Sequence, residues 1–472
     1  MLFTSFTYIL FLCLVIPLVR STEGVWRERV LLGASLVYYA AWDVRFVALL
    51  LALGVFTHAA GHRIAAARKS GTKPRFGNAT APVVAILLVL AAFKYTRWLM
   101  ELQNALGGTQ FTLPKIILPL GISFFTFECV SYLLDVQKGG AELTPLRRFL
   151  LFPAYFPHLV AGPILRIKEF APELDKLRRA TWLETLAGID RIVIGLLKKV
   201  VLADSLALFV DQGFSASPGR VGALDAWALT ISFALQIFFD FSGYSDIAIG
   251  VSRMVGIRLP ENFNLPYHAE SPSDFWNRWH MTLSRWVRDY LFFPLNMRAG
   301  KRVWLRYVFL VLVMSFVGLW HGAGVGFVIW GAWHGVLMVL HRVAQRRVGH
   351  LEDGPRIPLE RVGRVVSLIL LVAAWVPFRA PTLAAATAML RAMFTLRGFR
   401  PAYSINDYLF ALACLAGYVV LVPRVERFVQ RDPETHEVNG RTFWLRAPLY
   451  ALAVQFLFMF DRSNIAFIYF QF

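Results

Sequence analysis

Three histidines interrupt one of the most apolar parts of the chain. Residues 315–342 read SFVGLWHGAGVGFVIWGAWHGVLMVLHR and carry His321, His334 and His341. Imidazole is the side chain best suited to take a proton from a hydroxyl near neutral pH, so a histidine in apolar surroundings is a candidate general base. We expect this role for His321, whereas His334 is expected to hydrogen-bond within a helix bundle and His341 to lie at the membrane interface.

The residues around His321 are small on one side and aromatic on the other. Gly322, Gly324 and Gly326 remove side chains, so a substrate or another backbone can approach closely. Trp320 supplies a wall and is a candidate substrate contact. No cysteine or G-x-S-x-G motif indicates a covalent intermediate. The histidines lack carboxylates at ligand spacing, so no metal site is expected.

A further candidate histidine, His280, lies in the segment 261–295, ENFNLPYHAESPSDFWNRWHMTLSRWVRDYLFFPL. A helical wheel predicts an interfacial amphipathic helix that starts after Pro272 with Ser273 or Asp274 as its cap. The apolar face of this helix would hold Trp276, Trp279, His280, Leu283, Trp286, Val287 and Tyr290, and the polar face Arg278, Arg285, Arg288 and Asp289. A histidine on an apolar face is more often a packed core residue than a catalyst. We favour a functional role because His321 offers a partner.

Polar side chains also fall inside a predicted crossing, LQIFFDFSGYSDIAIG at residues 235–250. Two carboxylates and a glutamine cannot all face lipid, so this helix must face the protein interior or a wet cavity. The side chains can form a proton relay, a substrate-binding wall or a hydrogen-bonded scaffold, and scaffold is favoured for Asp246. The candidate substrate contacts of the whole chain are therefore Trp320, Asn277, Arg278, Trp276, Gln236, Asp240 and Tyr244.

The composition fixes the medium in which these residues act. Of the 472 residues 57% are hydrophobic and only 17% charged, which is far from the balance of a soluble globular chain. The sequence predicts an all-α polytopic integral membrane protein with about 11–13 transmembrane helices, plus re-entrant and interfacial helices. The candidate crossings are residues 2–19, 30–57, 81–100, 113–135, 187–207, 223–251, 304–320, 325–341, 364–380, 406–423 and 446–462.

Three prolines break the apolar segment FPAYFPHLVAGPILR, residues 152–166. They exclude a regular spanning helix, so we expect this segment to enter the membrane and return. For His158, a hydrogen-bonded structural role at a bend is favoured over a functional one.

The net charge of +19 reflects the orientation of the chain in the membrane and does not indicate nucleic-acid binding. Basic residues gather in short loops such as RIKEFAPELDKLRR at 166–179 and MRAGKRVWLR at 297–306, whereas the loop at 101–112 has no lysine or arginine. Lysine and arginine mark the cytoplasmic side, so both chain ends are expected outside. No repeat or long soluble insert occurs, and a single membrane domain over residues 1–472 is expected.

Seven stretches, in this order, resemble the membrane-bound O-acyltransferase family and its bacterial alginate O-acetyltransferase branch. They are PLGISFFTFECVSYLLDV, FPHLVAGPILR, QIFFDFSGYSDIAIG, FNLPYHAESPSDFWNRWHMTLSRWVRDYLFFPL, GLWHGAGVGFVIWGAWHG, WVPFRA and FIYFQF. In the family the WHG histidine is catalytic, which corresponds to His321. The residue after FWNRW varies between branches and is His280 here, as in the polysaccharide and teichoic acid branch. The resemblance implies a central tunnel in which His321 is the base and His280 polarises the thioester carbonyl or positions the donor.

The resemblance also implies the reactants. An acyl thioester, acetyl-CoA in the first instance or an acyl carrier protein, would be presented from the cytoplasm, and no permanently bound cofactor is needed. The acceptor would be an extracytoplasmic polysaccharide hydroxyl or a periplasmic acetyltransferase or esterase-like relay protein, with the enzyme in the bacterial inner membrane. D-alanyl transfer to a cell-wall polymer is the alternative. A proton-coupled transporter and a non-catalytic anchor for a polysaccharide synthase are the competing classes.

Overall fold

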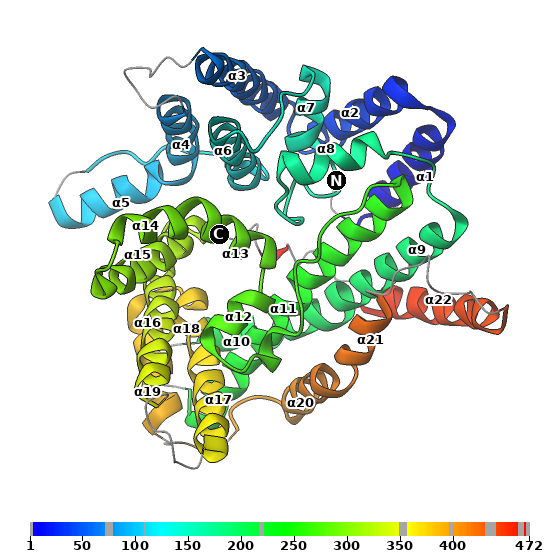
Figure 1. Ribbon diagram of the computed structural model, residues 1–472. Coiled ribbons are helices and arrows are strands. Elements are labelled where there is room, and N and C mark those ends of the chain that lie inside the picture. Colours follow the sequence, from blue (N-terminus) through cyan, green and yellow to red (C-terminus); the bar gives the residue numbers. More distant parts are fainter. Residues whose placement is uncertain are drawn as a thin grey trace. The chain divides into compact units, whose positions relative to one another are not determined.

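Helices form all the regular structure in the described part of the chain (Figure 1), which is a computed structural model. The structure describes residues 3–70, 79–107, 110–216, 221–348, 356–395, 398, 401–429, 440–460 and 467–468. The internal contacts divide the chain into two compact units, Met1–Val193 with Tyr244–Pro260, and Ile194–Gly243 with Glu261–Phe472. Each unit is built from two separate stretches of sequence. The expected single domain over residues 1–472 stays a prediction.

The first unit holds the helices from the start of the chain. They are α1 (Phe6–Ser21), α2 (Gly24–Ala40), α3 (Val44–Lys69), α4 (Thr80–Lys94), α5 (Thr96–Gly107), α6 (Ile122–Lys138), α7 (Leu146–Ala154), α8 (Ile167–Asp175) and most of α9 (Trp182–Leu196). The second half of α11 (Ala223–Val255) also belongs to this unit.

The second unit holds the first half of α11 and the remaining helices. Before α11 come the π-helix η1 (Leu197–Ala203) and α10 (Asp204–Phe214). After it come η2 (Pro266–His268), α12 (Pro272–Arg278), α13 (Met281–Val287), η3 (Arg288–Phe292), α14 (Phe293–Ala299), α15 (Val303–His321), α16 (Val325–Val348), α17 (Arg356–Ala373), α18 (Trp375–Arg379), α19 (Leu383–Thr395), α20 (Ile405–Val420), α21 (Val422–Val429) and α22 (Gly440–Phe460).

The helices confirm a polytopic membrane protein. Among the described residues, five helical stretches are long and apolar enough to cross a membrane: Val44–Lys69, Ala223–Val255, Val303–His321, Val325–Arg347 and Arg361–Arg379. The count is seven if each of two bent helix pairs is one span, namely α4 with α5, bent by 62°, and α20 with α21, bent by 47°. The other expected crossings consist of shorter or interrupted helices, such as α9, η1 and α10 over residues 182–214.

The proline-rich segment is irregular and buried, as expected for a re-entrant path. Residues 155–165 contain no helix, and all of them are buried. The Nε2 of His158 donates to the Phe152 carbonyl over 3.0 Å, and its Nδ1 lies 3.2 Å from Oε1 of Glu128. The Leu165 backbone N–H donates to the same Glu128 oxygen over 3.2 Å. These bonds support the structural reading of His158, since they tie the bend to α6.

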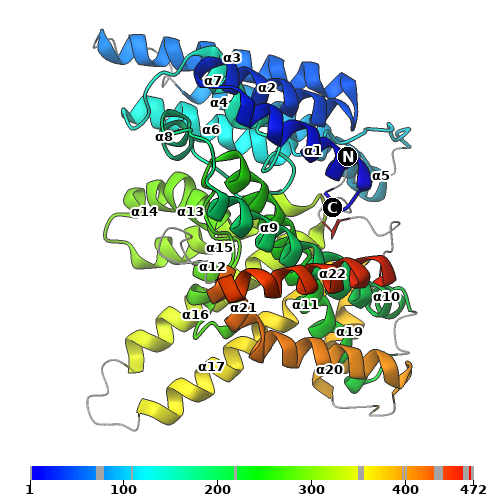
Figure 2. The same cartoon turned by 90° about the vertical axis from the view of Figure 1, so that its right-hand side faces the viewer.

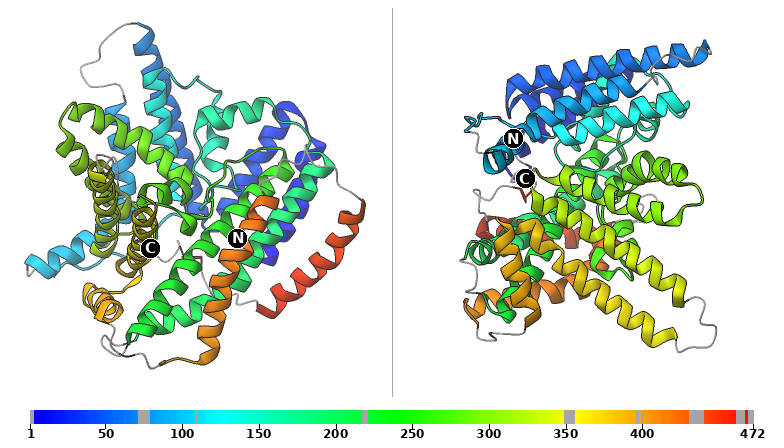
Figure 3. Two further views of the ribbon diagram at one scale, coloured as in Figure 1. Left: turned by 60° about the horizontal axis from the view of Figure 1, so that its bottom comes forward. Right: turned by 90° about the vertical axis from the view of Figure 1, so that its left-hand side faces the viewer.

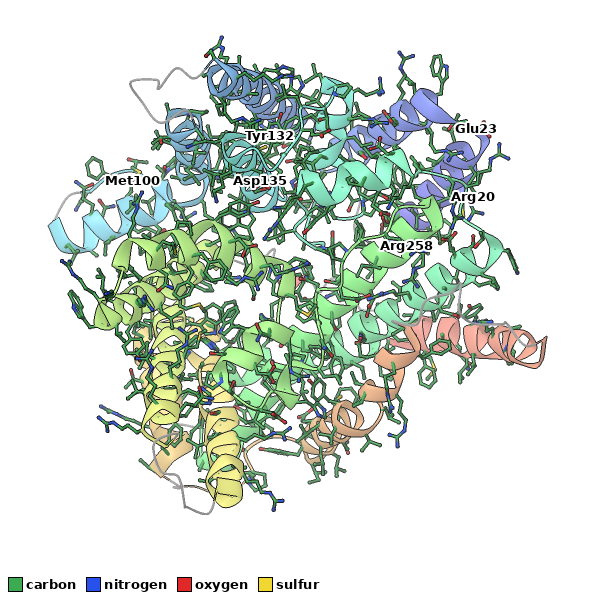
Figure 4. All side chains as sticks on the ribbon, viewed as in Figure 1. Arg20, Glu23, Met100, Tyr132, Asp135 and Arg258 are labelled. Atoms are coloured by element: carbon green, nitrogen blue, oxygen red, sulfur yellow. The ribbon has the colours of Figure 1, made fainter. Side chains whose placement is uncertain are left out.

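A band of charged contacts in the first unit agrees with the expected topology. The Arg20 guanidinium at the end of α1 donates to the Met254 carbonyl over 3.3 Å. Glu23 pairs with Arg179 over 3.1 Å, and Figure 4 shows Arg20 and Glu23 at the turn between α1 and α2. The turn after α1, the basic loop 166–179 and the end of α11 therefore meet, as segments on one membrane side should.

Helices α15 and α16 pack with their backbones in close approach. They lie side by side (Figures 1 and 2), and a Cβ added at Gly318 would lie 2.0 Å from the Phe327 carbonyl oxygen. A Cβ at Gly331 would lie 2.1 Å from the Met314 carbonyl oxygen. Small residues at such contacts are how membrane helices associate. On its other side α16 runs beside α17 (Figure 3), where Trp333 Nε1 donates to the Leu370 carbonyl over 3.1 Å.

Gly331→Ala is expected to destabilise the protein by about 1–3 kcal/mol, because the added methyl group overpacks the contact between the two helices. Gly417→Ala on α20 is the matched control, since nothing lies within 4 Å of an added Cβ there. Thermal melting of the purified protein in detergent measures both variants. Gly331→Ala should melt below wild type and Gly417→Ala at or above it. Equal melting of the two variants would contradict the close helix contact.

Candidate active site

His321 is the last residue of α15 and lies among aromatic rings of the second unit. Its side chain is buried, and its ring meets those of Trp320, Trp330 and Phe378 at centroid distances of 4.9, 5.2 and 5.8 Å. The chain turns at Gly322, where α15 ends in an extended conformation. The sequence correctly placed His321 at the end of a crossing helix.

The three glycines that follow His321 serve different purposes. A Cβ at Gly322 would lie 2.2 Å from the Phe327 ring, and one at Gly326 would lie 2.5 Å from the Pro377 carbonyl oxygen. These two glycines therefore make room for the protein's own side chain and backbone. At Gly324 a Cβ would meet Phe327 at 3.5 Å, which is an ordinary contact. The expected close approach of another backbone is confirmed at Gly326.

His280 lies between two helices, so the prediction of one continuous helix through this residue is wrong. α12 ends at Arg278, and His280 has the left-handed dihedrals φ 42° and ψ 54° before α13 starts at Met281. The helix start also differs: Ser271 is the cap, its side chain accepts from the Asp274 N–H, and Pro272 opens the helix. The residues of the predicted apolar face are nevertheless all buried: Trp276, Trp279, His280, Leu283, Trp286, Val287 and Tyr290.

The break at His280 is held by a neighbouring stretch of chain. The Asn264 N–H donates to the Arg278 carbonyl, and the Met281 N–H donates to the Asn262 carbonyl, each over 2.9 Å. A left-handed conformation is costly for a residue with a side chain and persists only where surrounding contacts over-determine it. Such positions cluster at functional sites, which supports a role for His280 beyond packing.

The hydrogen bonds of Asn262 fix the protonation of His280. Oδ1 of Asn262 accepts from the Thr282 backbone N–H, which can only donate, over 3.3 Å, so this atom is the amide oxygen. His280 Nδ1, 3.0 Å from the same oxygen, therefore carries a proton. Burial of the ring lowers the pKa of His280 to about 3, so the ring is neutral at pH 7. Nε2 is then its unprotonated nitrogen and can accept a hydrogen bond.

Trp320 brings the two histidines together. Its ring centroid lies 6.2 Å from that of His280 and 4.9 Å from that of His321. Phe241 of α11 also contacts His280, with ring centroids 4.7 Å apart. Two imidazoles from segments 41 positions apart in the chain thus share one aromatic wall, which suits acid-base chemistry on a substrate held beside it.

The other candidate contacts around His280 differ in position. Trp276 is buried in the second unit, whereas Asn277 is exposed. Arg278 pairs with Asp274 over 2.9 Å and is partly exposed. Trp320 therefore contacts His280 and His321, Trp276 contacts His334 and Trp330, and Asn277 lies at the surface of the unit.

The polar residues of α11 are held mainly by charged partners. Asp240 forms an ion pair with Lys199, whose Nζ lies 2.8 Å from Oδ1, and its Oδ2 accepts from the Ile468 N–H over 2.7 Å. Lys199 also pairs with Asp204 over 2.6 Å, so Asp240 belongs to a buried ion cluster. Sequence reasoning missed Lys199, although a lysine within an apolar segment signals a carboxylate partner.

Gln236 and Tyr244 lie on the two halves of α11. Gln236 is buried in the second unit, and its Oε1 has no partner among the described residues. Tyr244 belongs to the first unit, where its ring stacks on Phe3 at 4.3 Å. Gln236 thus has a buried acceptor without a partner among the described residues, and Tyr244 is placed by aromatic packing.

The described residues offer little to hold a metal ion. No group of three histidine, cysteine or carboxylate side chains in this part of the chain has a metal-binding arrangement. Cys129 and Cys414 are buried and Cys13 is exposed, and none of the three is disulfide-bonded. The expectation of a metal-free site stays a prediction.

Comparison with known proteins shows to which family the chain belongs. The chain is 39% identical over 404 residues to a probable alginate O-acetylase of Azotobacter vinelandii, covering 84% of this chain and 78% of the relative. The chain belongs to the membrane-bound O-acyltransferase family. The sequence model of that family matches residues 141–358, which include His280 and His321. This chain is therefore an O-acyltransferase that passes the membrane several times.

Other relatives of this O-acyltransferase act on different polymers by name. A peptidoglycan O-acetyltransferase of Helicobacter pylori is 31% identical over 93% of this chain and 90% of its own length. A teichoic acid D-alanyltransferase of Bacillus subtilis is 34% identical over 48% of this chain and 60% of its own length. The family's acyl group and acceptor thus vary between members.

In this O-acyltransferase, His280→Asn is expected to lower acyl transfer by roughly tenfold to a hundredfold. Asparagine tolerates the left-handed backbone, so the change removes the imidazole while keeping the chain path. Leu265→Asn is the control, because Leu265 is the other described non-glycine residue with positive φ, at 48°. Initial rates at matched membrane levels measure both. If the two variants lose equal activity, the imidazole of His280 has no specific role.

Proposed function

We propose that the protein moves an acetyl group from a cytoplasmic thioester, acetyl-CoA in the first instance, to a hydroxyl on the outer side of the membrane. The acceptor is an extracytoplasmic polysaccharide or a periplasmic acyl-relay protein, and the membrane is the bacterial inner membrane. The observation that carries the proposal is that the imidazole rings of His321 and His280 both lie near the ring of Trp320.

The chemistry follows from the two imidazoles. His321 takes the proton of the acceptor hydroxyl while its oxygen attacks the thioester carbonyl carbon. The new C–O bond forms, the C–S bond breaks, and the departing thiolate takes the proton from the His321 imidazolium. The products are an ester and a free thiol. His280, with Nδ1–H committed to Asn262, acts through Nε2 as an acceptor, which favours positioning of a substrate over polarisation of its carbonyl.

The relatives support a polymer acceptor. Alginate, peptidoglycan and teichoic acid all appear in their names, and each polymer lies outside the cytoplasm. An acetylated exopolysaccharide is the first choice, because the alginate O-acetylase relatives match 84% of this chain. D-alanyl transfer from a carrier protein is the second candidate, supported by the relatives that transfer D-alanine.

One assay tests the proposed function against its alternatives. Membranes containing the protein are given acetyl-CoA with and without isolated extracytoplasmic polysaccharide, and the release of free thiol is measured. Acceptor-dependent thiol release is expected. A carrier-protein donor is indicated if only the acyl carrier protein supports transfer. Absence of thiol release with either donor, together with proton flux across vesicles, would establish the transporter class in place of an enzyme.

A further inference from the structure

His334, which the proposed reaction does not use, is fully enclosed by aromatic rings. Its exposed fraction is 0%. Phe275 stacks on it at 5.7 Å, and Trp276 and Trp330 meet it edge-on at 5.3 and 4.9 Å. Neither ring nitrogen has a hydrogen-bond partner among the described residues, so the expected bond within the bundle is absent there.

Four tryptophans of the same cluster share this property. The rings of Trp276 and Trp330 lie 5.7 Å apart, those of Trp330 and Trp375 5.6 Å, and those of Trp375 and Trp279 5.1 Å. All are at most 6% exposed, and in the described part of the chain no atom accepts from their indole nitrogens. By contrast, Trp333 next to His334 donates to the Leu370 carbonyl.

This cluster has an excess of donors. An indole nitrogen only donates, while a neutral imidazole donates once and accepts once. Four indoles and one imidazole therefore offer five N–H donors and one acceptor nitrogen. A buried donor without an acceptor destabilises a fold, so the fitting ligand carries several acceptor oxygens and no charge that would need a counter-ion. Amide and thioester carbonyl groups meet this description.

The cluster lies on the donor's side of His321. Trp330 contacts both His321, at 5.2 Å, and His334. α16 runs from Val325 to a basic end with Arg346 and Arg347, which the charge pattern places in the cytoplasm. His334 stands nine residues into α16, roughly 14 Å toward that end. A thioester arm that reaches His321 from the cytoplasm would pass these N–H groups.

We propose that His334 and the indole N–H groups of Trp276 and Trp330 bind the amide carbonyl oxygens of the pantetheine arm that carries the acyl group. This inference rests on the proposed function, since it presupposes a thioester donor. The aromatic rings shelter the arm from lipid, and the N–H groups replace the water that its amides lose. His334 and the two tryptophans are thus positioning residues that set affinity for the donor.

The test compares Trp276→Phe, Trp330→Phe and His334→Leu with Trp333→Phe, all purified in detergent. Phenylalanine keeps an aromatic ring but loses the N–H and part of the ring volume, and the Trp333→Phe control shares the loss of volume. With S-acetylpantetheine as donor, Trp276→Phe should raise the donor KM roughly threefold to tenfold, as the loss of one buried hydrogen bond predicts. The other two cluster variants should raise it at least as much. Trp333→Phe, whose indole serves the contact with α17, should leave the donor KM unchanged.

A second donor separates the arm from the thioester itself. Ethyl thioacetate has the reactive group but no amides, so its KM should not respond to Trp276→Phe. The inference would be overturned if Trp276→Phe changed the KM for both donors equally. It would also be overturned if Trp276→Phe and Trp333→Phe had the same KM for S-acetylpantetheine. If the wild-type protein releases no thiol from any thioester, the proposed function fails, and that outcome is visible before any variant is compared.

Discussion

Replacing His321 by glutamine is expected to lower acyl transfer roughly a hundredfold to ten-thousandfold, the usual contribution of a general base. Glutamine keeps polar atoms near the imidazole position but cannot accept the proton of the hydroxyl. The change is sterically mild, because the side chain ends α15 between Trp320, Trp330 and Phe378 and requires no special backbone dihedral. Initial rates of acceptor acylation, at matched membrane levels, measure the effect.

The same substitution at His341 is the matched control. His341 lies on α16, 20 positions beyond His321, and is partly exposed. His341→Gln should transfer acyl groups at near the wild-type rate. Acetyl-CoA binding should survive in both variants, because His321 acts on the acceptor hydroxyl. Near wild-type acylation by His321→Gln would remove this residue from the mechanism.

The position of His321 could be predicted from sequence because its signals are local. An apolar run of the right length ends at the histidine, and glycines follow at once, so both the helix and its end are encoded within neighbouring residues. The same holds for the broken path through residues 155–165, since prolines act on the backbone where they stand. Burial along residues 276–290 was also predictable, because spacing of apolar side chains determines it.

The left-handed turn at His280 could not be predicted from that spacing. Trp276, Leu283 and Trp286 continue one apolar face across the break, so the periodicity looks uninterrupted. The bonds that set the dihedrals come from Asn262 and Asn264, outside the amphipathic pattern. A tertiary contact overrides helix propensity there, and the local residue types do not predict the break.

The roles of the α11 carboxylates required knowledge of their partners. From sequence, Asp240 served equally well as a substrate contact, a proton relay or a scaffold. Its ion pair with Lys199 joins residues from η1 and α11, which no local pattern links. The scaffold expectation for Asp246 is supported, because Oδ1 accepts from Arg191 Nε over 2.9 Å and the two side chains are 2% and 4% exposed.

Replacing Asp246 by alanine is therefore expected to destabilise the protein by about 3–5 kcal/mol, as breaking a buried ion pair from one side does. The guanidinium of Arg191 loses the carboxylate to which its Nε donates, and its charge stays buried in the interior of the first unit. Melting temperature and yield of folded protein in detergent should both fall. The catalytic rate per folded molecule should change little, because the pair belongs to the frame of the enzyme.

The double variant Arg191→Met with Asp246→Leu decides between a frame and a proton relay. Replacing both members of a buried ion pair by apolar residues of similar volume is often neutral or stabilising. The double variant should accordingly recover much of the stability lost in Asp246→Ala and should still transfer acyl groups. A proton relay would need the carboxylate itself, so apolar replacement would restore the fold and leave activity lost. That result would assign Asp246 a role in proton transfer instead of a structural role, and it would favour the proton-coupled transporter class.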